Sequence, residues 1–289
     1  MPSLETLPVE LLYEVQLYAL SVALPITSRR LRAIFNSSPA SFRAQYILGH
    51  LADDARLSDA VSTALRFPLC AIPVVDAVLR AWPPDPVAPT SDATESQGAL
   101  LSEGEEQGKV EPEPEGGNGS APAPRARPAE LPKRLFRALG PRTDREYRAG
   151  DAPLPLLRYL YAAPRLTHAP PDADSHAGYA LTRAVHAEHV PLVRLLLDHG
   201  ASPAHKRGLA VLVAIRRKQL SLVRMLIERT DAEPGAGKGG KKRRLEDRVE
   251  VTPEMLKTAV KAKARDIAEY FMEEKGCVPD MQTLQMLVR

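Results

Sequence analysis

An apolar eight-residue pattern occurs five times in this chain and constrains its fold more than any other feature. The clearest copy is VPLVRLLL, residues 190–197; the others are IPVVDAVL from Ile72, LPLLRYLY from Leu154, LSLVRMLI from Leu220 and, more loosely, RDIAEYFM from Arg265. Proline or serine at the second position suits the first turn of a helix, where a backbone N–H has no partner to lose. The apolar positions are nearly continuous, so each helix must be covered on more than one side. Stacked copies in a solenoid provide that cover.

Two of these copies belong to a longer repeat. A shift of thirty positions brings Ala180, Ala184, Val190, Leu192, Val193, Arg194, Leu195 and Leu196 onto Ala210, Ala214, Leu220, Leu222, Val223, Arg224, Met225 and Leu226. Each unit therefore reads as a first helix, a turn and a second, apolar helix. We expect such pairs at residues 57–67 with 72–82, 131–139 with 154–161, 178–186 with 190–197, 209–217 with 220–227, and 252–263 with 267–274. Residues 281–289 predict a first helix of a sixth unit or a cap.

The unit that contains VPLVRLLL resembles an ankyrin repeat. Ankyrin units of about 33 residues have a small alanine in the first helix, a short turn ending in histidine, an apolar second helix and a Gly-Ala-Asp/Ser-Pro return. The matching features here are Leu181, Ala184, His189, residues 190–197 and Gly200-Ala201-Ser202-Pro203, while Glu188 stands where the turn glycine is expected. The resemblance implies an all-α chain whose residues 130–289 form a divergent ankyrin-type helical-hairpin solenoid that binds another protein.

Three helices are expected near the N-terminus, over residues 7–20, 27–35 and 42–51, with a break at Pro25. The segments LPVELLYEV and SRRLRAIF, from Leu7 and Ser28, resemble the opening and a later helix of an F-box. This resemblance implies that residues 1–50 form a helical F-box-like module that docks an Skp-type adaptor of a cullin-RING ubiquitin ligase. The positions that match are Leu7, Pro8, Leu11, Leu12, Val15, Leu31 and Phe35. Alternatively, the same apolar residues pack against the first repeat as an N-terminal cap.

Composition changes abruptly between residues 83 and 128. Pro, Gly, Ser, Glu and Ala dominate there, and aromatic and branched apolar side chains are nearly absent. Such a mixture buries too little apolar surface to offset the entropy cost of ordering the chain. We therefore expect a disordered insertion at 83–128, between a first helix pair at 56–82 and the repeats at 130–289.

A second insertion, at residues 234–250, carries a basic loop whose cations are Lys238, Lys241, Lys242, Arg243 and Arg244. Residues 235–241 also match the outline G-x-x-x-x-G-K of a phosphate-binding loop. The next residue is Lys242 instead of the Ser or Thr that holds magnesium, so no nucleotide cofactor is expected. The loop could serve as a nuclear import signal or as an electrostatic contact for acidic partners. Alternatively, it is a solvated run of charge with no binding role.

The overall composition restricts the classes of function. A hydrophobic fraction of 44% and a charged fraction of 26% are typical of a folded protein, and a net charge of +3 is too small to predict a nucleic-acid-binding protein. Cys70 and Cys277 cannot build a disulfide framework or a four-cysteine metal site. The start of the chain lacks the pattern of a secretory signal, and no apolar run approaches the ~18 residues of a membrane span. A cytoplasmic or nuclear location is therefore expected.

No group of residues predicts catalysis. Neither a Ser-His-Asp or Cys-His arrangement nor a carboxylate pair stands out, and His186, His189, His199 and His205 fall in the repeat rather than in a metal-ligand pattern. We therefore expect no enzyme activity, cofactor or metal, and we expect an unknown protein target to bind the repeats. The candidate target-binding residues precede or occupy the turns of the best-formed pairs: Tyr179, Arg183, His186, Arg216 and Arg217.

Overall fold

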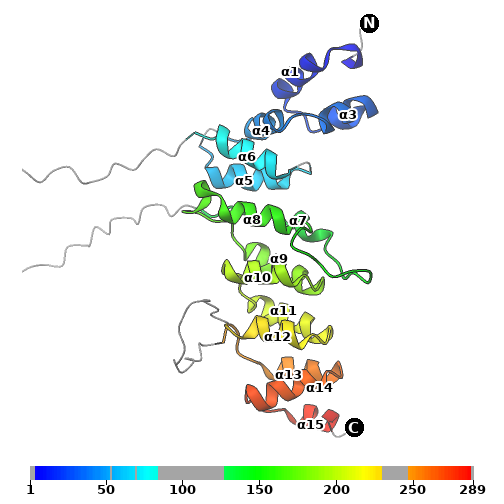
Figure 1. Cartoon of the computed structure of the whole chain (residues 1–289), viewed down its shortest axis with the longest axis vertical. Helices are drawn as coiled ribbons and strands as arrows, with labels where there is room; N and C mark the ends of the chain where they lie inside the picture. Colours follow the sequence, from blue (N-terminus) through cyan, green and yellow to red (C-terminus); the bar gives the residue numbers. More distant parts are fainter. Residues whose placement is uncertain (1–3, 53, 69, 84–126, 230–246, 288–289) are drawn as a thin grey trace, which may run out of the picture.

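The computed structural model describes residues 4–52, 54–68, 70–83, 127–229 and 247–287. Within these residues the regular elements are helices, and the one strand-like pairing is an isolated parallel bridge between Glu130 and Asp172. The expected all-α fold is therefore confirmed. The helices follow one another along the long axis of the molecule, so that the two ends of the chain lie at opposite ends of the stack (Figure 1).

The N-terminal module and the first helix pair come before the long insertion. Their helices are α1 (Val9–Ala19), α2 (Leu24–Thr27), α3 (Arg29–Asn36), α4 (Ala40–Leu48), α5 (Leu57–Arg66) and α6 (Ile72–Ala81), after a short 3-10 turn η1 (Leu4–Thr6). Pro25 does not break the chain between helices as expected. It lies in the first turn of α2, where its missing N–H leaves no bond unmade.

The remaining helices form successive pairs: α7 (Arg134–Arg137) with α8 (Leu154–Ala162), α9 (Ser175–His186) with α10 (Val190–Asp198), α11 (His205–Arg216) with α12 (Leu220–Ile227), and α13 (Pro253–Lys261) with α14 (Arg265–Glu269). Helix α8 runs into the 3-10 turn η2 (Pro164–Leu166), helix α14 continues as the π-helical segment η3 (Tyr270–Glu274), and α15 (Met281–Leu287) packs on α13. First helices contact first helices along the row α7, α9, α11, α13 and α15. Second helices contact in the same way, α8 with α10 and α12 with α14.

All five copies of the apolar pattern begin a second helix at their first residue: α6, α8, α10, α12 and α14. Four of these starts are as expected, whereas α14 begins two residues before the predicted start at residue 267. In α10 the side chains of Leu192, Val193, Leu196 and Leu197 are buried, whereas Arg194, at the fifth position of the pattern, is exposed. Buried residues from α5 through η3 join in one hydrophobic core. The leucines of the pattern therefore hold neighbouring units together.

The turns between first and second helices share one backbone device. Glu188, Lys218 and Lys263 occupy equivalent places in three successive units, and all have positive φ angles, 58°, 55° and 55°. This left-handed conformation normally favours glycine. Glu188, Lys218 and Lys263 thus hold a turn conformation that glycine would adopt with less strain.

One predicted helix is much shorter in the structure. We expected residues 131–139 to be helical, but α7 covers only Arg134–Arg137. The Arg183 guanidinium, from α9, donates to the carbonyls of Phe136, Arg137 and Leu139, so these acceptors at the end of α7 are satisfied without a further helical turn.

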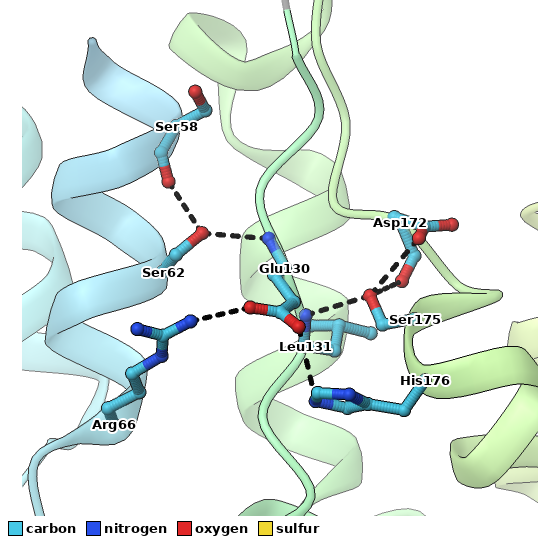
Figure 2. A network of polar contacts seen from close by, with 8 residues as sticks. All are labelled: Ser58, Ser62, Arg66, Glu130, Leu131, Asp172, Ser175 and His176. Carbon is cyan, nitrogen blue, oxygen red and sulfur yellow. Dashed lines mark hydrogen bonds and ion pairs between the residues drawn. The ribbon is translucent and has the colours of Figure 1, made fainter. Parts of the chain in front are cut away.

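The chain enters the stack after the long insertion through a polar junction between α5 and α9 (Figure 2). The backbone N–H of Glu130 donates to Ser62 Oγ of α5 at 2.7 Å, and the N–H of Leu131 donates to Ser175 Oγ of α9 at 3.0 Å. The Ser62 hydroxyl donates in turn to the Ser58 carbonyl, and the Ser175 hydroxyl to the Asp172 carbonyl. Residues far apart in sequence thus fix the re-entry point. Most of the predicted disordered insertion, residues 84–126, lies outside the described residues.

The ends of the second insertion are clamped by one lysine. The Lys275 Nζ lies 3.7 Å from Glu228 Oε1, before the insertion, and 2.8 Å from Asp247 Oδ2, near its C-terminal end, and the Lys275 side chain is only 6% exposed. Tyr270 also donates from its hydroxyl to Glu228 Oε1 at 2.8 Å. The basic residues Lys238, Lys241, Lys242, Arg243 and Arg244 lie outside the described residues.

Candidate interaction surfaces

The N-terminal module divides the F-box-like positions between its interior and its surface. Leu12, Leu31 and Phe35 are buried and form a small core with Phe42, against which the Tyr13 ring packs with its centroid 4.3 Å from that of Phe42. These side chains shape the module but offer no area to a partner. Pro8 is exposed directly before α1.

The opposite side of α1 carries the remaining positions. Leu7, Leu11 and Val15 line a shallow groove of about 510 Å³ together with Glu14, Tyr18 and Ala19. Leu11 is 44% exposed and Tyr18 is 89% exposed. Leu11 and Val15 lie four positions apart on α1 and share a stripe along it, while Leu7 lies just before the helix begins. We call this set of groove-lining residues the α1 face.

The five candidate target-binding residues lie in different environments. Arg183 serves the end of α7, as described above, and Arg217 forms an ion pair with Glu188 at 2.8 Å. Tyr179 is half-buried and lies beneath the ammonium group of Lys133, and His186 is half-buried as well. Only Arg216 is fully exposed, where it lines a separate cavity near α13. Contacts between units therefore occupy Arg183 and Arg217, and the structure does not bring the five residues together in one pocket.

A larger groove, of about 880 Å³, lies between the loop of residues 140–150 and helix α10. Its arginines are Arg142 and Arg145 from the loop, Arg158 from α8 and Arg194 from α10. Its acidic residues are Glu146, Glu188 and Asp198. We call it the mixed-charge groove.

The arginines of this groove differ in how they are held. Arg142 and Arg145 form ion pairs with Asp151, at 3.2 and 2.8 Å. The pKa of the Asp151 carboxyl is lowered, first by the hydrogen bond from the backbone N–H of Arg148 and then by these two arginines. Arg158 and Arg194 make no hydrogen bond or ion pair within the described chain. Two fixed and two unengaged guanidinium groups thus face a space that a polar peptide segment would fit.

Sequence reasoning missed this groove because it depends on the loop of residues 140–150 folding back over α10. One signal was present. The fifth position of the pattern is arginine in three successive copies, Arg158, Arg194 and Arg224. Since that position points away from the core, a repeated cation there indicates a charged outer face.

The histidines have structural contacts. His189 is buried before α10, accepts a hydrogen bond from the Leu192 N–H through Nδ1 at 3.3 Å, and stacks on Tyr147. The His199 ring stacks on Tyr161 at 3.7 Å, and burial lowers the pKa of both histidines. Among the described residues, no group of three or more His, Cys, Asp or Glu side chains is arranged to hold a metal ion.

The geometry defines a helical stack with grooves on its surface. No family model matches the chain, and neither the curated proteins nor the solved structures contain a match. In the part of the chain that the structure describes, no helix is both long and apolar enough to cross a lipid bilayer.

Proposed function

We propose that this chain is a protein-binding subunit: the N-terminal module docks an Skp-type adaptor of a cullin-RING ubiquitin ligase, and the helical stack holds a protein target. The observation that carries the proposal is the α1 face, an exposed apolar surface built from the residues of the F-box-like segment. Exposed apolar grooves of this kind are suited to a partner helix. Such a role belongs in the cytoplasm or the nucleus.

The mixed-charge groove is the best candidate for the target site. The loop of residues 140–150, α8, α10 and α12 all contribute to its walls, so a bound segment would contact several units at once. Arg216 and Tyr179 stay as outlying candidates. The proposed activity is recognition, with no chemical step performed by this chain.

Co-purification with an Skp-type adaptor tests the first half of the proposal. Leu11→Glu places a charge on the α1 face at a side chain that is 44% exposed, so we expect adaptor binding to be lost while the helical fold is kept. Ile26→Glu is the matched control, since Ile26 is an apolar residue of the same module, 75% exposed, that does not line the α1 face. Absence of adaptor binding by the wild-type chain, or equal binding by Leu11→Glu, would refute the ligase role.

A second candidate function is an ankyrin-type scaffold without a ligase role, in which the N-terminal helices act as a cap. The observation that favours it is the packing of α4 on α5 and α6, where Ala44 and Ile47 share a core with Ala60, Ala64, Val74 and Val78. This function predicts that deletion of residues 1–50 lowers the thermal stability of the stack and removes no partner. The ligase role predicts loss of the adaptor.

A further inference from the structure

Exposed large apolar side chains gather at the two ends of the molecule. Within the described residues they are Leu4, Val9, Leu11, Tyr18, Val22 and Ile26 at one end, and Val278, Met281, Leu284 and Leu287 at the other. Among the described residues between these two ends, none belongs to this class. Since these two ends lie far apart (Figure 1), each molecule carries two separate apolar surfaces.

The C-terminal surface follows one side of α15. Met281 and Leu284 lie about one turn apart on α15, and Val278 lies three residues before the helix; Met281 and Val278 are 75% and 79% exposed. The buried Thr283 marks the other side of the helix, toward the stack. In the units before it, a first helix such as α9, α11 or α13 is covered by a second helix of its own pair. The exposed stripe of α15 therefore suits a helix that is apolar on more than one side.

Helix α1 is a helix of that kind. Leu12 fills the core of the N-terminal module, while Leu11 and Tyr18 lie on the α1 face. Helix α1 is therefore apolar on two sides, like the second helices of the stack.

The charges near the two ends are complementary. Helix α1 carries the exposed Glu10 and Glu14 and no basic residue. Helix α15 carries no charge, and the cavity beside it is lined by three cations, Arg216, Lys257 and Lys261, against the two acids Glu254 and Asp280. An approach of α1 to α15 brings acidic residues to a surface with an excess of basic ones.

We propose that the chain associates head to tail with a second copy of itself, the α1 face of one molecule covering the exposed stripe of α15 on the next. One contact of this heterologous type buries both apolar ends, whereas an adaptor on α1 covers only one of them. The association is independent of the proposed ligase role. Because both use the α1 face, an adaptor would compete with it.

Light scattering on the purified full chain, over a wide range of concentrations, tests the proposal. We expect the mean mass to rise with concentration. Tyr18→Glu and Met281→Glu, at side chains 89% and 75% exposed, should each weaken association by at least about tenfold, because each places a charge in the contact. Arg137→Glu, at an exposed position of α7 away from both ends, is the control and should leave the mass unchanged.

An equimolar mixture of Tyr18→Glu and Met281→Glu decides the geometry. The first variant keeps an intact C-terminal end and the second an intact N-terminal end, so the mixture should form a dimer and nothing larger. A wild-type chain that stays monomeric at every concentration overturns the proposal. The proposal is also overturned if only one of the two variants weakens association, because that would indicate contact between two equivalent ends. A mixture that remains monomeric overturns it as well.

Discussion

The carboxylate of Glu130 lies between two helices that precede and follow the long insertion: its Oε2 is 2.6 Å from the guanidinium of Arg66, and its Oε1 is 3.3 Å from Nε2 of His176 (Figure 2). Arg66 ends α5, and His176, with a φ of 58°, lies in the kinked segment at the start of α9. Together with the two serine hydroxyls that accept from the backbone, this side chain anchors the re-entry of the chain into the stack.

The serine contacts at this junction should contribute more to stability than the ion pair. Glu130 and Arg66 are 41% and 62% exposed, and exposed pairs of this kind contribute about 0–1 kcal/mol. Ser175→Ala instead leaves the buried N–H of Leu131 without its acceptor, which costs about 1–3 kcal/mol. Urea unfolding of Glu130→Gln and Ser175→Ala checks this order. Equal losses would mean that the carboxylate is the main anchor.

The fourth and seventh positions of the apolar pattern should behave differently from the fifth. Leu196 in α10 is fully buried, so Leu196→Ala should lower the free energy of unfolding by about 2–5 kcal/mol through lost burial and a cavity. Val193 occupies the fourth position and is equally buried. Arg194→Ala removes an exposed side chain and should change stability by less than about 0.5 kcal/mol. Thermal unfolding followed by circular dichroism measures both, and a large loss for Arg194→Ala would contradict the assigned register.

Glycine at a turn with positive φ should stabilise the stack. Lys218 has a φ of 55° and no ion pair in the structure, so Lys218→Gly relieves an unfavourable backbone conformation and should raise the free energy of unfolding by about 0.5–1 kcal/mol. Lys218→Val should have the opposite effect, since a branched side chain fits poorly there. Glu188→Gly is expected to gain less than Lys218→Gly because it also removes the contact with Arg217.

His189 should make stability depend on pH. Burial lowers the pKa of its ring below the ordinary value of 6.5, so the folded state favours the neutral form. As pH falls below about 6.5, the unfolded state binds the proton first, and the free energy of unfolding should decrease until the pH passes below the folded-state pKa. Urea unfolding at a series of pH values measures this slope.

His189→Gln should make the slope shallower. Glutamine is the residue at the equivalent position of the next unit, Gln219, so the turn can accept it. Some slope should remain because burial also lowers the pKa of His199. His168→Gln, at an exposed position, is the control; a slope that His189→Gln leaves unchanged would show that this ring is not its source.

The sequence by itself determined the helical class and the units of the stack. Four copies of a locally encoded pattern each began a helix at the expected residue, since apolar spacing and a first-turn proline or serine act within a few residues. The fifth copy has Asp266 at that position, and its helix began two residues earlier than expected. The same pattern distinguishes Arg194, a charged residue at the fifth position, from the apolar residues on either side of it. The F-box-like and ankyrin-like interpretations remain predictions.

The tertiary structure decided what depends on residues distant in sequence. Arg183 of α9 serves the carbonyls at the end of α7, Lys275 joins Glu228 to Asp247, and Leu11 lies on the surface whereas Leu12 lies in the core. The mixed-charge groove likewise exists only because a loop folds back over α10. Such features depend on which units become neighbours in space. A periodic apolar pattern predicts the helices, but it does not predict which polar side chains from distant parts of the chain meet between them.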